Sequence, residues 1–345
     1  MNHKVTTRQK LLNENGVLNE PGYATELIFD YDRADIKASK LLIKEWDYYL
    51  ITNKKYAVAL TIADNGYMGL LSASIMDYEA GTDITCSVPT LFPMGKHGAP
   101  KTSKIGDFAV KTKRAEFSFE NDGEKRRLTC TYRKYQGDDD LIVDVTLTDE
   151  PKDSMVIATP FFEKENKFYY NQKINCMTAV GYAKLGDRTY EFNDEYSMAV
   201  LDWGRGVWSY NNTWYWGSMS TRLPSGDKFG FNIGYGFGNT AAATENMLFF
   251  NGVAHKLESV TFNIPVDEKG KDDYMSDWTF TSSDGRFEMK FKPIVDRSAI
   301  IDAKVMCSIQ HQVFGRFTGK AILDDGTVIE LKDEIGFAEK VHNKW

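Results

Sequence analysis

The chain has 345 residues, of which 42% are hydrophobic and 26% are charged, so it can bury a sizeable core and does not have the composition of a disordered protein. Its formal net charge of -7 argues against a nucleic-acid partner or an anionic membrane surface, because phosphate binding needs a clustered surplus of Lys and Arg. At roughly 150 residues per domain, this length predicts two units.

The amino-terminal segment MNHKVTTRQKLLNENG lacks the apolar core and cleavage site of a signal peptide, and no apolar run is long enough to cross a bilayer. We therefore expect a cytoplasmic protein. Cys86, Cys130, Cys176 and Cys307 lack the CxxC spacing of zinc or redox pairs and are expected to be reduced thiols. The sequence has neither a phosphate-binding loop nor a ligand-spaced set of His and Cys, so no cofactor and no metal is predicted.

Short apolar or alternating runs, separated by turn residues, follow one another from YYLITNKKYAVALTIADNGYMG near the start to KAILDDGTVIELK near the end. Tight hairpin turns are predicted at five dipeptides: Asn65-Gly66, Asp122-Gly123, Asn251-Gly252, Asp284-Gly285 and Asp325-Gly326. No long amphipathic segment lies between the runs, which argues against a parallel sheet. The pattern predicts an all-β, meandering antiparallel fold.

Two segments hint at an internal duplication. FSFENDGEKRRLTCTY, beginning at Phe117, is similar to WTFTSSDGRFEMKF, beginning at Trp278, and each contains an Asp-Gly turn. Two similar barrels or sandwiches would explain the similarity. The polar stretch YEFNDEYS around Asp194 provides a boundary, so the predicted domains are residues 1–193 and 194–345.

Residues 201–218, LDWGRGVWSYNNTWYWGS, combine most of the tryptophans with Asp202 and Arg205. A hairpin turn at Asn211-Asn212 would place Trp208 opposite Tyr215, and Ser209 opposite Trp214. Strand alternation then puts Trp214 and Trp216 on one face and Trp208 on the other. A sheet that is aromatic on both faces is buried on both, or it is buried on one and lines a cavity on the other.

Asp202 is the candidate general acid of this segment. Indoles that desolvate a carboxylate disfavour its charged form, which would raise the pKa of Asp202 and let it donate a proton near neutral pH. The alternative is a structural role, in which Asp202 pairs with Arg205 and holds the strand end; that pairing would lower the pKa instead.

A second candidate site lies in TENMLFFNGVAHKL, where the Asn251-Gly252 turn pairs Leu248 with His255. Asn246 and His255 are then polar exceptions on a mostly apolar face, and buried polar groups need partners. Glu245 falls on the opposite face if the strand is regular.

The final segment, IGFAEKVHNKW, carries Glu339, His342 and Trp345 at intervals of three. On a helical turn these residues would stack on one side, and Glu339 could orient His342 as a base. A fraying polar tail is the alternative. His311 and His342 with a carboxylate could also bind a metal, but no local spacing supports such a site.

Several long strings, among them LDWGRGVWSYNNTWYWGS, GFNIGYGFGNTAAATENMLFF, HQVFGRFTGKAILDDGT and GFAEKVHNKW, resemble the family catalogued as domain of unknown function 2804 over nearly the whole chain. That family has no established activity to transfer. More distantly, an Asp-Trp element, a W-x-W strand and a glycine-bearing hairpin are similar to the lipocalin-like double-barrel group that includes carotenoid hydratases and tocopherol cyclases. The resemblance implies two consecutive lipocalin-like antiparallel barrels, and it matches Asp202 to a strand-end aspartate that is a suspected proton donor to a carbon–carbon double bond. The sequence departs from that group where GRG follows Trp203 and where Tyr215 separates the paired tryptophans.

These observations predict that an apolar or polycyclic small molecule binds in an aromatic-lined cavity and undergoes cofactor-independent acid–base chemistry of the hydratase, cyclase or isomerase type. The candidate catalytic residues are Asp202, Glu339, His342 and Glu245. The candidate binding residues are Trp203, Arg205, Trp208, Trp214, Trp216, Tyr235, Asn246, His255 and His311.

Two alternatives belong to other functional classes. A carbohydrate-active enzyme would use an acid/base pair drawn from Asp202, Glu245, Asp296 and Glu339, with tryptophans stacked on sugar faces. A binding protein without chemistry would enclose a cavity whose carboxylates are all engaged in structural hydrogen bonds.

Overall fold

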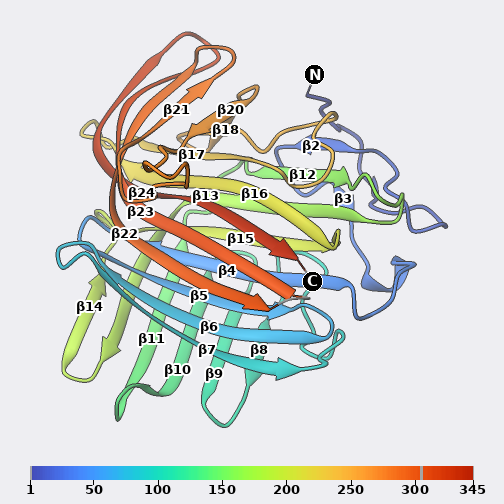
Figure 1. The fold of residues 1–345 in the computed structure, drawn as a ribbon, viewed down its shortest axis with the longest axis horizontal. Helices are drawn as coiled ribbons and strands as arrows, with labels where there is room; N and C mark the ends of the chain where they lie inside the picture. Colours follow the sequence, from blue (N-terminus) through green and yellow to red (C-terminus); the bar gives the residue numbers. More distant parts are fainter. Residues whose placement is uncertain (1, 304–305, 345) are drawn as a thin grey trace.

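The computed structural model describes residues 2–303 and 306–344. Apart from a short 3-10 helix at Arg33–Asp35, the regular structure of this part of the chain consists of β-strands. Most of them form two curled antiparallel sheets, which Figure 1 shows in blue to green and in yellow to red. β1 (Gln9–Lys10) and β3 (Phe29–Asp30) form a separate parallel pair. The predicted all-β, double-barrel fold is confirmed.

The first sheet is assembled from the amino-terminal part of the chain, in the order β7-β6-β5-β4-β15-β13-β11-β10-β9-β8, with β2, β12 and β14 attached. Its strands are β2 (Gly22–Ala24), β4 (Ile43–Thr52), β5 (Tyr56–Asp64), β6 (Met68–Asp77), β7 (Thr82–Leu91), β8 (Phe108–Lys111), β9 (Ala115–Asn121), β10 (Arg126–Gln136), β11 (Asp139–Thr148), β12 (Met155–Pro160), β13 (Phe168–Leu185), β14 (Arg188–Phe192) and β15 (Met198–Val207).

The second sheet has the order β19-β18-β17-β16-β24-β23-β22-β21-β20. Its strands are β16 (Asn211–Arg222), β17 (Lys228–Tyr235), β18 (Met247–Phe250), β19 (Val253–Lys256), β20 (Val260–Asn263), β21 (Trp278–Ser282), β22 (Phe287–Ala303), β23 (Met306–Ile322) and β24 (Val328–Lys344). In Figure 1 the long strands β22, β23 and β24 run from this sheet across the face of the first one.

All five predicted turn dipeptides join consecutive, mutually paired strands. At Asn251 and Gly252 both φ angles are positive, 47° and 80°, as a two-residue turn of type I′ requires. The predicted pairing of Leu248 with His255 is confirmed as well. The two similar segments both form hairpins, β9–β10 and β21–β22.

The predicted hairpin at Asn211-Asn212 is wrong. β15 is hydrogen-bonded to β4 and β13 in the first sheet, whereas Asn211 and Asn212 already belong to β16 and pair with Lys344 and Asn343 of β24. The chain crosses between the sheets at this point, so each flanking strand pairs elsewhere. The change of sheet lies between Val207 and Asn211, while the division at residues 193 and 194 stays a prediction.

Three apolar clusters hold the molecule together: one inside each curled sheet and one between the two sheets. Because successive side chains of a strand point to opposite faces, single strands contribute to two of these clusters. In β15, Leu201 and Trp203 belong to the first interior, and Val200 belongs to the layer between the sheets. No helix in the described part of the chain is long and apolar enough to span a membrane.

Candidate functional site

A cavity of about 390 Å³ lies between the two sheets. Its aromatic wall consists of Trp46, Tyr48, Trp208, Trp214, Trp216 and Phe237. Its polar wall includes Thr61, Ser72, Thr85, Ser87, Lys173, Asp202, Arg297, Gln310, Gln312, Glu339 and Asn343. The volume falls within the range of small-molecule sites, and the mixture of aromatic and polar groups is typical of them. The aromatic cluster of the structure therefore fits a hydrophobic binding site.

Strand register brings the charged groups together. Lys173 of β13 lies beside Asp202 of β15, and Asp202 lies beside Tyr48 of β4. Asp202 Oδ1 accepts hydrogen bonds from Asn171 Nδ2 at 2.6 Å and from Lys173 Nζ at 3.0 Å, and its Oδ2 accepts one from Trp46 Nε1 at 3.0 Å. Asp202 is thus a hydrogen-bond acceptor at both oxygens and the ion-pair partner of a buried lysine.

Lys173 faces the aromatic wall as well as Asp202. Its Nζ atom lies 4.0 Å from the centre of the Trp216 ring, a cation–π contact. Trp216 in turn donates its indole hydrogen to Asn232 Oδ1 at 2.7 Å. The ammonium group is therefore held between a carboxylate and an indole, each of which has a fixed position.

Gly204 makes room for the tryptophan that binds Asp202. The Trp46 ring lies against the backbone of β15 at this residue, and a methyl group at position 204 would come within 1.9 Å of Trp46 Cζ2. The same indole contacts Trp208 edge-on, with ring centres 5.2 Å apart. The first glycine of the GRG sequence is therefore explained by close packing of an aromatic ring.

Glu339 of β24 is the second carboxyl group of the cavity. Its Oε1 accepts a hydrogen bond from Trp214 Nε1 at 3.0 Å, and its Oε2 accepts one from Gln312 Nε2 at 3.0 Å. Burial raises the pKa of Glu339 to about 7, although the Trp214 hydrogen bond and the charges of Lys173 and Arg297 oppose that rise. Near neutral pH this carboxyl group is therefore divided between its acidic and basic forms.

Glu245 lies next to this group without lining the cavity. It is 1% exposed, and burial raises the pKa of its carboxyl group against the opposing charge of Lys173. Neither oxygen has a hydrogen bond of normal geometry among the described residues, although Tyr169 lies close enough to influence its pKa. Lys173 is thus shared electrostatically by Asp202, Glu245 and Glu339.

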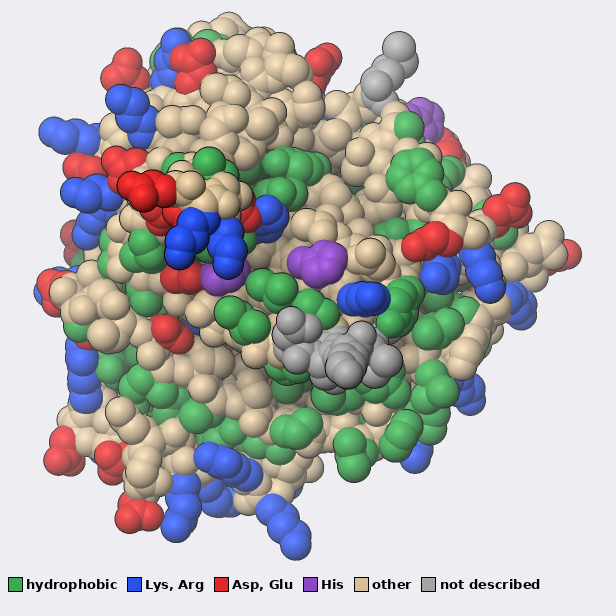
Figure 2. Space-filling view, viewed as in Figure 1, with side chains coloured by type: hydrophobic (Ala, Val, Ile, Leu, Met, Phe, Trp, Pro, Cys, Tyr) green, Lys and Arg blue, Asp and Glu red, His purple; other side chains and the backbone are tan. Residues whose placement is uncertain are grey.

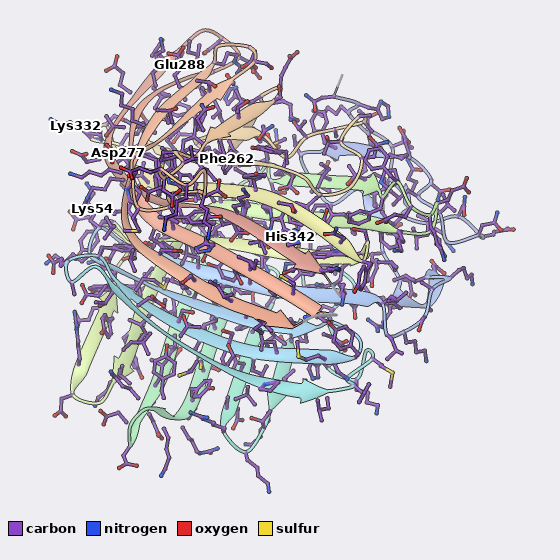
Figure 3. All side chains as sticks on the ribbon, viewed as in Figure 1. Lys54, Phe262, Asp277, Glu288, Lys332 and His342 are labelled. Atoms are coloured by element: carbon purple, nitrogen blue, oxygen red, sulfur yellow. The ribbon has the colours of Figure 1, made fainter. Side chains whose placement is uncertain are left out.

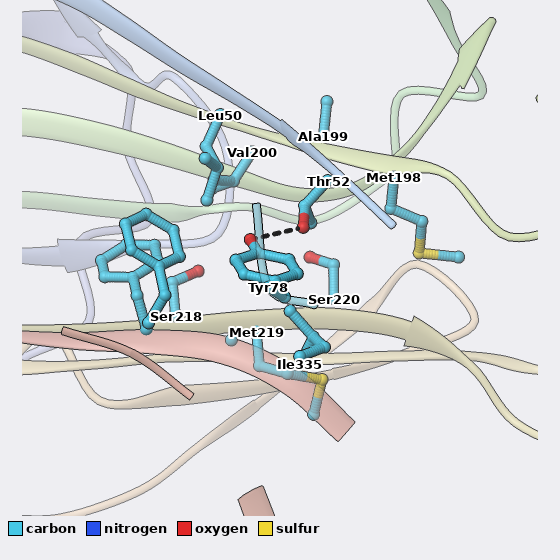
Figure 4. Close-up of a pocket in the computed structure, with 13 residues that line it drawn as sticks. Leu50, Thr52, Tyr78, Met198, Ala199, Val200, Ser218, Met219, Ser220 and Ile335 are labelled. Atoms are coloured by element: carbon cyan, nitrogen blue, oxygen red, sulfur yellow. Dashed lines mark hydrogen bonds between the residues drawn. The ribbon is translucent and has the colours of Figure 1, made fainter. Parts of the chain in front are cut away.

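A packed apolar layer bounds the cavity beyond Asp202 and Glu339. Val200 and Phe337 lie two residues from Asp202 and Glu339 on the same strands, and Leu50 of β4 pairs with Val200. Together with Tyr78 these residues surround a space of only about 10 Å³. Figure 4 shows this layer and the hydrogen bond of 3.0 Å between the hydroxyl groups of Thr52 and Tyr78. At the other end Ile301 lines the cavity and is 54% exposed, so the cavity opens to solvent there.

Trp203 and Arg205 do not reach the cavity. Both side chains point into the first interior, where the Arg205 guanidinium stacks on Trp203 at 4.1 Å and donates to Asp47 Oδ1 at 3.0 Å. The alternative in which Arg205 pairs with Asp202 is wrong, because an interval of three residues on a strand places two side chains on opposite faces.

The carboxyl-terminal segment is extended rather than helical, so the predicted stacking of Glu339 and His342 is wrong. Glu339 faces the cavity, whereas His342 lies on the other face of β24 and hydrogen-bonds Thr213 Oγ1 at 2.7 Å. Figure 3 labels His342 near the end of this strand. Trp345 lies outside the described residues.

The remaining candidate binding residues also lie away from the cavity. Tyr235 stacks on Tyr215 at 4.5 Å, and Asn246 accepts a hydrogen bond from Gly234 N at 2.8 Å. His255 lies 3.2 Å from Asp324 Oδ2. His311 contacts Asp296 Oδ2 at 2.7 Å. In the described part of the chain, no three His, Cys, Asp or Glu side chains gather as a metal site.

Sequence reasoning missed Trp46, Tyr48, Lys173, Gln312 and Arg297, which come from four strands distant in sequence. One signal was available, because Trp46 and Tyr48 are aromatic residues at alternate positions of one strand. The lysine and the three amide side chains within the FYYNQKINC segment were a second signal.

The geometry defines an antiparallel double barrel of the lipocalin-like kind, with an aromatic, carboxyl-bearing cavity between its two sheets. The model of the family described as domain of unknown function (DUF2804) matches residues 2–345, and the chain belongs to this family. A search of curated proteins found no match.

Two solved structures share the fold. A protein from Nitrosomonas europaea provisionally named AttH superimposes with a TM-score of 0.55 and 12% identity, covering 90% of this chain and 96% of its own. Kievitone hydratase from Nectria haematococca superimposes with a TM-score of 0.52 and 12% identity, covering 100% and 98%. Identities this low establish similarity of fold alone.

Proposed function

We propose that the protein binds an apolar or polycyclic small molecule in the cavity between the sheets and catalyses cofactor-independent acid–base chemistry on it. The reaction is of the hydratase, cyclase or isomerase type. The observation that carries this proposal is the Glu339 carboxyl group, which is buried in an aromatic cavity wall and has a pKa of about 7. A general acid is most effective when its pKa lies near the working pH.

Glu339 is better placed than Asp202 to donate the proton. Both oxygens of Asp202 accept hydrogen bonds, and Lys173 supplies one of them as a cation. Among the described residues, Glu339 accepts hydrogen bonds from the neutral donors Trp214 and Gln312 and from no cation. We therefore assign the acid role to Glu339, and Asp202 fixes Lys173 and adds a negative charge to the site.

A hydration would proceed in two balanced steps. The Glu339 carboxyl group gives its proton to one carbon of a double bond, whose π electrons form the new C–H bond, and the adjacent carbon becomes a cation. The indole faces of Trp208, Trp214 and Trp216 stabilise that cation. Water then adds to the cation and returns its extra proton to the Glu339 carboxylate. Loss of a proton from a neighbouring carbon instead gives an isomer.

The fold supports this class of reaction by analogy, because one protein with the same double-barrel architecture is a hydratase. A second candidate is a binding protein without chemistry. It is favoured by the fact that every carboxyl oxygen of Asp202 and Glu339 accepts a hydrogen bond from the protein.

Liquid chromatography with mass spectrometry of a panel of apolar alkenes incubated with the protein separates the two candidates, because it resolves an isomer by retention time and a hydrated product by mass. Catalysis predicts a product that gains one water or an isomer of unchanged mass, and Glu339→Gln is expected to lower its formation by more than ~100-fold while ligand affinity is kept. Glu330→Gln changes an exposed carboxyl group of the same strand and is the matched control. Tight binding with no product from any bound compound would support the binding protein.

A further inference from the structure

Arg297 is a cation of the cavity wall that the proposed chemistry does not use. It extends from β22 of the second sheet, and its Nη1 donates to Ser74 Oγ of β6 in the first sheet at 2.8 Å. Its guanidinium carbon lies 6.0 Å from the centre of the Tyr48 ring. A guanidinium has five N–H donors, and one of them makes the only hydrogen bond that Arg297 forms within the described residues.

Three of the buried cations among the described residues each face a carboxylate. Lys173 lies 3.0 Å from Asp202, Arg205 lies 3.0 Å from Asp47, and Arg126 lies 2.5 Å from Glu150. Pairing of this kind is expected, because an uncompensated buried charge is costly. Arg297 is only partly buried and forms no ion pair with any described carboxylate. Within the described residues, its charge therefore acts on Glu339 and Asp83 only at longer range, without a direct ion pair.

The carboxyl groups near the cavity offset the positive charge of Arg297 only in part. Lys173 is neutralised by Asp202. Glu339 is separated from Arg297 by Gln312 in the strand register, and burial keeps its carboxyl group partly protonated near neutral pH. Asp296 pairs with His311, and Asp83 interacts with Arg297 at longer range, without an ion pair. When Glu339 is protonated, Arg297 faces one negative charge fewer, and this favours the binding of an anion near its guanidinium.

Two further polar atoms of the cavity wall lack a hydrogen-bond partner among the described residues. They are Trp208 Nε1, a donor, and Asn343 Oδ1, an acceptor. Buried polar groups are rarely left unpaired in native proteins. Each of these two atoms is buried, so a small side-chain movement would be needed before it could meet a polar group of a ligand.

We propose that Arg297 binds a carboxylate group of the ligand, so that the cavity takes an amphipathic organic acid whose apolar body packs against Trp208, Trp214 and Trp216. This inference rests on the proposed function, since it names the substrate class of the same cavity. Arg297 is the residue that sets specificity, because it makes the charged contact and the aromatic wall accepts any flat apolar body.

Paired probes test the assignment: 1-pyrenebutyric acid and its methyl ester, titrated against the protein near pH 6.5, where Glu339 is largely protonated. The acid is expected to bind ~10-fold or more tightly than the ester, as a charge-assisted hydrogen bond predicts. Arg297→Gln is expected to abolish that preference and leave the affinity for the ester unchanged. Arg297→Lys should keep part of the preference. Arg316→Gln, on the neighbouring strand and outside the cavity, is the control.

The outcomes separate this inference from the proposed function. If acid and ester bind the wild type equally, or if Arg297→Gln weakens both by the same factor, Arg297 serves only to join the sheets and the inference is overturned. In either case the cavity still binds apolar molecules, so the proposed function stands. If neither probe binds the wild type, the proposed function and the inference fail together.

Discussion

Asp202 and Arg205 lie three residues apart on β15 and face opposite sides of it: Asp202 pairs with Lys173 at 3.0 Å, and Arg205 pairs with Asp47 at 3.0 Å. Asp202→Asn is therefore expected to destabilise the protein by about 3 kcal/mol, because it leaves the Lys173 ammonium buried without its counterion. Lys173→Met should lower the free energy of unfolding by a similar amount.

Double mutants in urea unfolding check this assignment of partners. The combined change Asp202→Asn with Lys173→Met should cost clearly less than the sum of the single changes, since the two groups share one interaction. Asp202→Asn with Arg205→Ala should be close to additive. The reverse pattern of couplings would show that the ion pairs are assigned wrongly.

The pKa of Glu339 makes a prediction about stability and pH. Its pKa is raised from 4.5 to about 7 on folding, so the folded chain holds this proton over a range where the unfolded chain has released it. Glu339 therefore contributes stability that is fully present below the unfolded pKa and is lost as the pH rises to about 7. The full difference is on the order of 3 kcal/mol.

Chemical unfolding of the wild type and Glu339→Gln near pH 5 and near pH 8 measures this contribution, because the amide does not titrate. The wild type should lose stability relative to the variant as the pH rises. A difference between the two proteins that is independent of pH would argue against a raised pKa at this residue, and with it against Glu339 as the acid.

Close packing at Gly204 gives a prediction that needs no ligand. Gly204→Ala would place a methyl group 1.9 Å from the Trp46 ring, so the indole must move and its hydrogen bond to Asp202 must break. We expect a loss of about 2 kcal/mol or more of stability, together with a change in tryptophan emission. The loss should be smaller when Trp46→Ala is already present, and an equal loss in both backgrounds would show that the ring is not the obstacle.

The fold was predictable from the sequence because period-2 patterns and turn dipeptides act locally. The pairing of Leu248 with His255 followed directly from the Asn251-Gly252 turn. The placement of Trp214 and Trp216 on a common face also followed from alternation, and both line the cavity. Trp208 lines the same cavity because it comes after β15 has ended, where alternation no longer applies.

The cavity was less predictable because partners in the two sheets are set by tertiary packing. No local pattern indicates that Trp203 lies in the interior of the first sheet while Asp202 lies between the two sheets. Nor does the sequence indicate that Lys173 pairs with Asp202. Charged groups also mix over the face shown in Figure 2, so no patch on that face indicates a ligand class. The position of Arg297 became informative only when its lack of a carboxylate partner could be seen.

Tryptophan fluorescence should report binding, since Trp46, Trp208, Trp214 and Trp216 all line the cavity. Apolar polycyclic ligands are expected to quench the emission, and Trp208→Phe should reduce the quenched fraction. Trp278 lies in the interior of the second sheet, so Trp278→Phe should leave the ligand-dependent loss of emission unchanged. Quenching by oligosaccharides and not by apolar compounds would instead support a carbohydrate-active site.

The most direct test is a crystal structure of the protein with a ligand found in that screen. We predict electron density for the ligand between the two sheets, in contact with Trp208, Trp214 and Trp216, with one of its atoms within hydrogen-bond distance of a Glu339 carboxyl oxygen. Density confined to the interior of either barrel or to the outer surface, with the cavity between the sheets unchanged, would contradict the account.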